Sequence, residues 1–311
     1  MADLALVAIM ALWGSSFAIL RTLLAGGAES AASPLLLLGT RMGLATALLV
    51  AYLALRGGGI RTRLAALQRP EGRQLLRDGL ACGGLLALGF VLQTEGLQRT
   101  TASRSGFLTG LLVVFVPLLE LVIFRKRPPL PALAGLLLAF AGMAILSGPW
   151  REEAASTLVG DALTVGCAAV FAGHILLLGR VAARHRILPL LLLQLACVAA
   201  AALAVGPLVE VQRLTFSTRL WLAVGYLSLF CTLLAFGVQT WAQRHTTPVR
   251  LALISALEPV FAALWAALLL GERLTSIELS GAGLIILGVV LGEVGPLVWK
   301  RTLGRSNQQR G

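Results

Sequence analysis

The chain has 311 residues, 58% of them hydrophobic and only 13% charged, and its mean hydropathy is +0.87. Soluble globular proteins are about 45–50% apolar and about 25% charged, so this chain has too few polar side chains to cover a surface in water. Its net charge of +12 would indicate a nucleic-acid partner in a soluble protein, but the basic residues stand in short links between apolar runs. The composition therefore excludes a soluble nucleic-acid-binding protein and predicts a protein of the lipid bilayer.

Ten apolar runs follow one another along the chain, each near the roughly 20 residues that a helix needs to cross a bilayer. Pro, Gly and charged residues punctuate most of the gaps, and no run alternates in polarity as a barrel strand does. We therefore predict an all-α integral membrane protein with ten transmembrane helices. The spans are expected at 4–24, 35–55, 79–98, 102–124, 131–148, 159–179, 187–206, 219–241, 249–270 and 279–299.

The distribution of arginine and lysine predicts the orientation in the membrane. The first run lacks a basic flank and a cleavage site, so it reads as the first span rather than as a signal peptide. With the N-terminus inside, the inner links and the tail carry 18 Arg and Lys residues, and the outer links and helix ends carry seven. Because basic residues concentrate in cytoplasmic loops, we expect a multi-pass protein of the cell inner membrane with both termini in the cytoplasm.

An internal repeat is the most informative feature of the sequence. Residues 90–104 read FVLQTEGLQRTTASR and residues 236–250 read FGVQTWAQRHTTPVR, and they share Phe, Gln, three Thr and Arg at one constant offset without a gap. Self-similarity at this distance indicates a duplicated unit. We predict two five-helix halves, residues 1–150 and residues 151–311, the second ending in a short basic cytoplasmic tail.

Two weaker matches are consistent with the duplication. The run Pro34–Leu38 matches Pro189–Leu193, although leucine runs are common in membrane helices. Pro117 aligns with Pro259 if a small difference in length is allowed between the two halves. We predict from these matches that the paired residues occupy equivalent positions in the two halves.

An odd number of spans in each half predicts that the halves have opposite orientations. After five crossings the second half starts on the other side, so the Thr100-Thr101 turn is expected outside and the Thr246-Thr247 turn inside. Such inverted repeats are typical of secondary transporters, whose substrate site lies near the bilayer midplane between the repeats. The architecture therefore favours alternating access.

Several short motifs follow one another along the spans. Together they make the chain resemble the ten-helix EamA-type members of the drug/metabolite transporter superfamily. The resemblance covers nearly the whole chain and implies transport of a small metabolite, often export, without specifying the substrate. One departure is the basic Phe124–Arg127 segment, which lacks the acidic residue of the matching turn in the second half. The motifs are Trp13-Gly-Ser-Ser-Phe17, Arg41, Thr100-Thr-Ala-Ser-Arg104, Pro117, Glu258-Pro259 and Gly271-Glu-Arg-Leu274.

Polar side chains within the spans are the candidates for substrate contact, since a charged group at a helix centre costs about 2.5–3.5 kcal/mol on insertion and needs a partner. An aromatic wall beside hydroxyl groups is also a reasonable lining for a metabolite cavity. The cavity candidates are Trp13, Ser15, Ser16, Arg41, Gln93, Phe115, His174 and Gln239.

The charged, histidine and amide candidates also have a purely structural interpretation. Arg41 is a counter-ion for a carboxylate substrate, or it pairs inside the protein, for instance with Glu95. His174 relays protons or binds substrate, or it is a hydrogen-bonded packing residue. The repeat-related Gln93 and Gln239 bind substrate or bond across helices.

Glu258 is the candidate for proton coupling, because it lies mid-span just before Pro259, which frees a backbone carbonyl one turn back. The alternative is a neutral, hydrogen-bonded structural carboxylic acid. In the last span, Gly288-xxx-Gly292 is typical of helix packing or of a homodimer face.

Two other classes of function are alternatives to a carrier. A polytopic membrane enzyme acting on lipid-linked substrates needs clustered acids, a zinc motif or a serine nucleophile, and the sequence has no HExxH and no GxSxG. A channel needs a ring of like polar groups, which two halves do not supply. With no phosphate-binding GxxxxGK[ST] loop and no CxxC pair among four cysteines, we expect no enzyme activity, no cofactor and no metal. We expect a small-metabolite exporter.

Overall fold

The computed structural model describes residues 1–24, 33–56, 69–100, 102–148, 157–211, 213–214 and 217–308. Within these ranges, ten helical passages are long and apolar enough to cross a membrane. The predicted all-α fold with ten spans is confirmed.

In the first half, the fourth span is broken into two helices and the others are continuous. The helices are α1 (Ala2–Leu24), α2 (Pro34–Leu55), α4 (Pro70–Leu97), α5 (Ala102–Gly110), α6 (Leu112–Phe124) and α7 (Leu130–Ser147).

In the second half, the ninth span is broken and the eighth span contains a π-helical segment, η3. The elements are α8 (Leu158–Val181), the 3-10 turn η2 (Ala182–Arg184), α9 (Ile187–Val209), α10 (Thr218–Tyr226), η3 (Leu227–Leu234), α11 (Ala235–Ala242), α12 (Pro248–Ser255), α13 (Glu258–Leu270) and α14 (Ser276–Gln308).

Local sequence signals fix where several helices begin and end. Proline stands in the first turn of α2, α4, α7 and α12, where its missing N–H costs nothing. The Thr157, Ser217 and Thr247 side chains accept hydrogen bonds from first-turn amides as N-caps. Gly148 and Gly271 end α7 and α13 in the left-handed conformation that favours glycine.

Two spans extend beyond the predicted apolar runs. The third begins at Pro70 rather than near residue 79, and the last helix continues to Gln308 rather than ending near residue 299 in a tail. Hydrophobicity marks only the part of a helix that meets lipid, whereas the backbone stays helical as far as capping and propensity allow. The charged turns at these ends are therefore helical.

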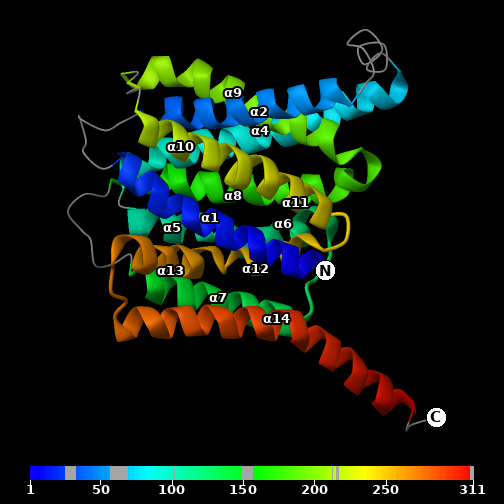
Figure 1. The fold of residues 1–311 in the computed structure, drawn as a ribbon. Helices are drawn as coiled ribbons and strands as arrows, with labels where there is room; N and C mark the ends of the chain where they lie inside the picture. Colours follow the sequence, from blue (N-terminus) through cyan, green and yellow to red (C-terminus); the bar gives the residue numbers. More distant parts are fainter. Residues whose placement is uncertain are drawn as a thin grey trace.

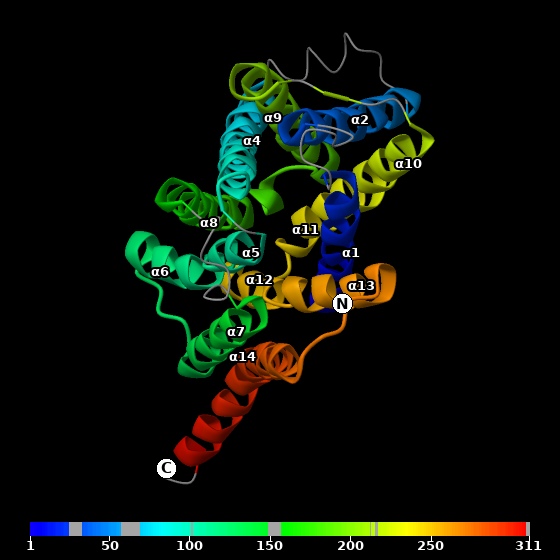
Figure 2. The same cartoon turned by 90° about the vertical axis from the view of Figure 1, so that its left-hand side faces the viewer.

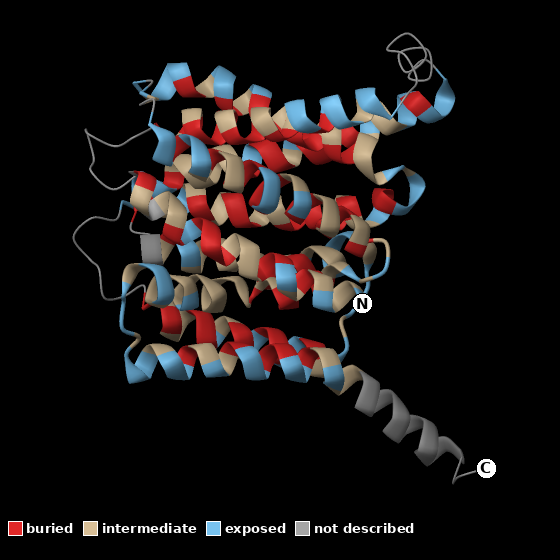
Figure 3. Cartoon of the chain, in the orientation of Figure 1, coloured by how far each residue is buried: buried red, intermediate tan, exposed pale blue. Residues whose placement is uncertain are grey.

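The helices form a bundle in which long neighbouring pairs lie side by side (Figure 1, Figure 2). Helix α14 packs along α7, α9 packs along α2 and α4, and α4 also packs along α8, while α1 packs against α13. Buried residues lie on the faces that the helices turn toward one another, and exposed residues lie on the outer rims of α9 and α14 (Figure 3). The N-terminus and the C-terminal end of α14 lie on the same side (Figure 1), as an even number of crossings requires.

The two halves are inverted copies, as the odd number of spans predicted. Helix α6 covers residues 112–124 and α13 covers 258–270, which are 146 residues apart at both ends, and α7 and α14 begin 146 residues apart. The α4–α5 turn and the α11–α12 turn lie at opposite ends of the bundle (Figure 1). Thr100 and Thr246-Thr247 lie in these turns, and Thr101 is outside the described residues.

This register corrects the predicted equivalence of Pro117 and Pro259. At the constant offset Pro259 corresponds to Val113 in the first turn of α6, whereas Pro117 lies inside that helix. No length change is needed. Pro259 lies in the first turn of α13, where its missing N–H removes no helical hydrogen bond, whereas Pro117 lies inside α6 and lacks the amide that would bond to the Val113 carbonyl.

The leucine-run match was also misaligned. Helix α2 begins at Pro34 and α9 at Ile187, a shift of 153 residues, and at this shift six of the eight buried positions of α2, including Leu37, Arg41 and Met42, recur on α9. The predicted pairing of Pro34–Leu38 with Pro189–Leu193 uses a shift of 155. In the correct register Arg41 corresponds to Gln194, a residue that the sequence analysis passed over.

Glycines allow α7 and α14 to approach backbone to backbone. A Cβ on Gly135 would lie 2.5 Å from the Gly288 oxygen, and a Cβ on Gly142 would lie 2.6 Å from the Gly281 oxygen. Gly135 and Gly281 are repeat-related, as are Gly142 and Gly288, so the two contacts are symmetric. The Gly288-xxx-Gly292 motif is therefore a packing face within the chain, which is one of its two predicted roles.

Candidate functional site

Four aromatic rings form a row across the contact between the two halves. The ring centroids lie 5.3 Å apart for Trp13 and Phe236, 6.1 Å for Phe236 and Phe90, and 5.3 Å for Phe90 and Phe171. Phe90 and Phe236 are 146 residues apart, and Trp13 corresponds to Phe171 at the shift of 158 that also superposes Asp3 on Asp161. The row is therefore symmetric about the axis that relates the halves.

Close packing of α1 on α13 brings Trp13 to this row. Gly14 touches α13 so tightly that a Cβ there would lie 2.7 Å from both Ala262 N and Phe261 Cβ. The indole Nε1 of Trp265 donates a hydrogen bond to the Ala11 carbonyl at 2.9 Å. The absent glycine side chain thus lets two backbones meet, and the tryptophan holds them together.

The π-helix η3 provides polar partners for α1. The Trp13 indole Nε1 donates to the Cys231 carbonyl at 2.8 Å, and the Cys231 thiol donates to the Leu12 carbonyl at 3.2 Å. Next to η3, the hydroxyl of Tyr226, the last residue of α10, lies 2.8 Å from the buried Ser15 hydroxyl, while Ser16 donates to the Trp13 carbonyl within α1 at 2.7 Å. A π-helical turn offsets backbone groups from the regular ladder and is frequent at functional sites.

Arg41 lies beside the aromatic row and is only 9% exposed. Its guanidinium carbon is 5.6 Å from the centroid of the Phe90 ring, a cation–π distance. Its Nε is buried and has no hydrogen-bond partner among the described residues. The buried cation therefore retains an unused donor near the contact of the halves.

The predicted pairing of Arg41 with Glu95 is wrong. The Glu95 carboxylate pairs with Arg99 at 2.6 Å and accepts from the Gln98 amide at 3.2 Å. Both partners lie within one turn of Glu95 at the end of the third span. A local pair within one helix needs no long-range approach, and so Glu95 remains at the helix end.

Glu258 begins α13, immediately after the break that separates it from α12. Its half-buried carboxyl makes no hydrogen bond or ion pair with any described residue. Glu258 and Arg41 both act electrostatically on the Cys231 thiol, so one polar region contains a carboxyl group, a guanidinium group and the aromatic row. The partial positive charge of a helix N-terminus favours a carboxylate at this position.

The remaining candidates are placed as follows. Gln239 is buried on α11 with its Oε1 unpartnered among the described residues, and the repeat-related Gln93 is half-buried on α4. Phe115 packs against the hydrophobic core around α6 and α12. An amide oxygen without a donor is costly when buried, which makes Gln239 the more informative member of the pair.

His174 contacts Gln194 rather than the aromatic row. Its Nε2 lies 2.8 Å from the Gln194 Oε1, and the Gln194 amide donates to the Leu190 carbonyl at 3.3 Å. Both side chains are buried. Gln194 was missed by the sequence analysis, although a single amide within a leucine-rich span is a recognisable signal.

Two ion pairs at opposite ends of the bundle were also missed. Arg104 binds Asp161 at 2.7 Å, and Arg250 binds Asp3 at 2.9 Å. The arginines are repeat-related, and so are the aspartates. The aspartates lie near the ends of their spans, where a charged side chain is common and gives no signal of its own. The matched Arg104 and Arg250 of the internal repeat were the available signal.

The two pairs have different additional partners. Asp161 also accepts a hydrogen bond from the Thr100 hydroxyl at 2.9 Å. Arg250 also binds Glu293 of α14, with its Nε 2.8 Å from the carboxylate. Each pair joins a broken span of one half to the first helix of the other half.

Ten spans in two inverted halves, with polar and aromatic side chains at their contact, are an architecture typical of membrane transporters. The chain matches the EamA-like transporter family over residues 1–148 and 160–292, and it belongs to that family. It is accordingly a membrane transporter, and the predicted family resemblance is confirmed.

Relatives agree with this assignment. An uncharacterized transporter of Archaeoglobus fulgidus is 30% identical over 215 residues, covering 69% of this chain and 68% of the relative. The uncharacterized inner membrane transporter YedA of Escherichia coli K12 is 29% identical over 304 residues, covering 94% and 90%. A crystal structure with 21% identity superposes with a TM-score of 0.76 over 94% of this chain and 96% of the other, which shows the shared fold.

Proposed function

We propose that this transporter moves a small amphipathic metabolite out of the cell by alternating access. Amino acids, nucleosides and drug-like compounds are the substrate classes that fit. The observation that carries the proposal is the symmetric aromatic row at the contact of the halves, with buried Arg41 beside it. An aromatic wall accommodates an apolar substrate group, and the guanidinium accommodates a carboxylate.

The two symmetric ion pairs support alternating access. Arg104–Asp161 joins the fourth span to the sixth, and Arg250–Asp3 joins the ninth to the first at the other end. A movement that opens one end separates one of these helix pairs while the other stays closed. Because the halves are inverted copies, the two conformations have related packing and similar energies.

Packing around the third and eighth spans differs between the halves. On α4, a Cβ at Gly89 would lie 2.3 Å from Phe171, and one at Gly83 would lie 2.8 Å from Cys197. The equivalent positions of the eighth span are Ala235 and Leu229, within or beside the π-helix. The third span thus packs more closely against its neighbours than the eighth span does. Such a difference between equivalent spans is expected if this structure is one of two conformations that exchange during transport.

The following side chains are proposed to line the substrate path. Arg41 is the counter-ion, Trp13 is the aromatic wall, and the Gln239 oxygen, which has no partner among the described residues, accepts a hydrogen bond from the substrate. The full proposed set is Trp13, Ser15, Ser16, Arg41, Gln93, Phe115, His174 and Gln239.

Glu258 is proposed to couple transport to the proton gradient. It follows a helix break, its carboxyl has no partner among the described residues, and it shares the polar region with Arg41. Protonation would remove the negative charge of the Glu258 carboxylate from this region, which also contains the Arg41 guanidinium. The relative energies of the two conformations would change as a result. On the arginine bias, we place both termini in the cytoplasm.

The first test identifies the substrate. Cells that overproduce the protein are challenged with toxic amino acids, nucleosides and their analogues, and compounds that they tolerate are assayed for flux in proteoliposomes. We expect at least one such compound to cross only protein-containing vesicles. A folded, reconstituted protein that moves none of the tolerated compounds would contradict the proposal.

The second test uses the same vesicles and an imposed pH step. Flux by the native protein is expected to follow the pH step, and Glu258→Gln is expected to keep exchange of substrate for substrate while losing the response to pH. Glu120→Gln, which removes another carboxyl group within a span, is the matched control. If Glu258→Gln keeps the full pH response, Glu258 is not the coupling site.

A further inference from the structure

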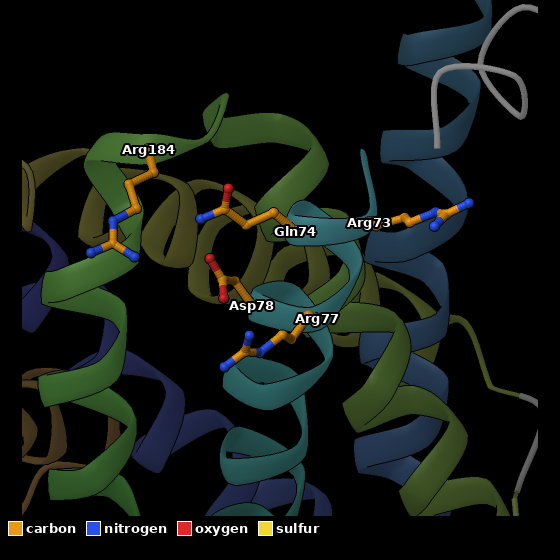
Figure 4. A pocket seen from close by; sticks show the side chains of 5 residues that line it. All are labelled: Arg73, Gln74, Arg77, Asp78 and Arg184. Carbon is orange, nitrogen blue, oxygen red and sulfur yellow. The ribbon is translucent and has the colours of Figure 1, made fainter. Parts of the chain in front are cut away.

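A basic pocket lies away from the aromatic row, at one end of the third span. Its volume is about 350 Å³, and it is lined by Arg73, Gln74, Arg77, Asp78 and Arg184. The first four belong to α4 of the first half, and Arg184 belongs to η2 of the second half. Figure 4 shows Gln74 and Asp78 pointing toward Arg184, Arg77 beside them, and Arg73 pointing toward α2.

The arginines of this pocket are not neutralised within the part of the chain that the structure describes. Arg73, Arg77 and Arg184 are exposed, and no described carboxylate forms an ion pair with them. Asp78, the one acid in the lining, is bound by His185 at 2.7 Å. The pocket therefore offers guanidinium groups to an external anion.

The second-half side of the pocket is held in place. The Arg244 Nε donates to the Ala182 carbonyl at 2.9 Å, and its guanidinium also donates to the His185 carbonyl. These bonds fix η2, from which Arg184 extends. Two guanidinium groups from different halves, one on a fixed turn, form a pre-organised site for a phosphate group.

An apolar strip continues from the pocket along α4. Leu80 and Leu88 are 53% and 48% exposed, and Ala81 and Gly84 are exposed between them, with open space beside Gly84. These residues share one helix face with Arg77. From Arg77 to Leu88 the helix rises about 16 Å, close to half of the roughly 30 Å hydrocarbon core.

We propose that this pocket binds the headgroup of an anionic phospholipid. The phosphodiester lies between Arg77 and Arg184, and an acyl chain follows the strip from Leu80 to Leu88. The arginine bias places this end of the bundle at the cytoplasmic leaflet, whose anionic lipids attract basic pockets between transmembrane helices. A lipid bound here ties the third span to the turn after the sixth, across the two halves. This proposal is independent of the transported substrate.

The test is lipid retention by the purified full-length protein, measured by native mass spectrometry with phosphatidylglycerol or phosphatidylcholine added in detergent. We expect preferential retention of phosphatidylglycerol. Removing two interfacial arginines in R77Q/R184Q is expected to weaken it about 30-fold. R77K/R184K, which keeps the charge but not the planar guanidinium geometry, is expected to retain more phosphatidylglycerol than R77Q/R184Q and less than the native protein.

The matched control is K126Q/R127Q, which removes two exposed charges from a link on the same side. It is expected to bind phosphatidylglycerol as the native protein does. Equal losses in both double variants would show attraction by overall charge and would overturn the proposal. So would equal retention of the two lipids by the native protein, or displacement of phosphatidylglycerol by an equal concentration of inorganic phosphate. If R77Q/R184Q shows no thermal transition and is therefore unfolded, the single variant Arg184→Gln, at an exposed residue, is tested in its place. Unchanged retention of phosphatidylglycerol by this variant would overturn the proposal.

Discussion

Arg41 is a buried cation in the second span whose repeat-related position is occupied by the uncharged Gln194. Gln194 is bonded to His174 and to the Leu190 carbonyl, whereas the Arg41 Nε has no described partner. The side chain at this repeat position is thus hydrogen-bonded in the second half, whereas in the first half its Nε has no described partner. A charge kept unpaired in a span is the pattern expected of a substrate contact.

We predict that Arg41→Gln weakens recognition of carboxylate-bearing substrates. Losing a hydrogen bond to a charged group costs about 1.5–3 kcal/mol, so KM should rise about 10- to 150-fold. The measurement is concentration-dependent flux in proteoliposomes. Arg56→Gln, at the exposed end of the same helix, is expected to leave KM unchanged, and an unaltered KM in Arg41→Gln would assign Arg41 to packing.

At the scale of elements, the broken spans and the π-helix distinguish this bundle from a set of straight helices. Both the fourth and the ninth spans break at the same repeat position, so the break is a property of the fold. The π-helix has no counterpart, because the matching residues of the third span lie within a regular α-helix. It therefore marks a local difference between otherwise symmetric halves.

The pairing of α7 with α14 yields a prediction at this scale. Gly288→Ala would place a Cβ 2.6 Å from Ala139 N and from the Gly135 oxygen. Backbone atoms cannot rotate away as a flexible side chain can, so α7 and α14 must move apart. This is expected to lower the free energy of unfolding by about 1–3 kcal/mol. The melting temperature of the purified protein should fall by several degrees.

Gly283→Ala, on the same helix, is the control for this substitution. No atom of the described part of the chain lies within 4 Å of the added Cβ, and alanine is the better helix former. Its melting temperature is expected to stay the same or to rise. Equal melting temperatures for the two variants would mean that α7 and α14 are not in backbone contact.

At the scale of the whole molecule, the two ion pairs should set the balance between conformations. We predict that Asp161→Asn opens one end of the bundle and Asp3→Asn opens the other, because each removes a single pair. Exposed ion pairs contribute about 0.2–1 kcal/mol, so populations should shift by up to about fivefold. The expected changes are opposite in direction.

Labelling of Gln93→Cys by an impermeant maleimide, in a Cys197→Ala background, reports the accessible side in vesicles of known orientation. Cys82, Cys167 and Cys231 are buried and remain in place. Glu71→Gln, which removes an exposed acid outside the ion pairs, should leave labelling unchanged. If both aspartate variants increase labelling from the same side, the pairs do not act as alternating contacts.

The sequence by itself determined the ten spans, the inverted repeat and the family. These follow from periodic, chain-local information: a bilayer requires about 20 apolar residues for each crossing, and a duplication retains matching residues such as Gln93 and Gln239. The candidates Trp13, Arg41 and Glu258 were found because polar and aromatic groups are conspicuous in an apolar run.

Only the tertiary structure decided which residues meet. It paired Asp3 with Arg250 and Asp161 with Arg104, separated Arg41 from Glu95, and brought Gln194 to His174. It also set the register between the second and seventh spans, which leucine runs cannot define because every leucine is alike. Contacts between residues up to 254 positions apart depend on the rotation and depth of each helix, and these are fixed by packing against all its neighbours at once.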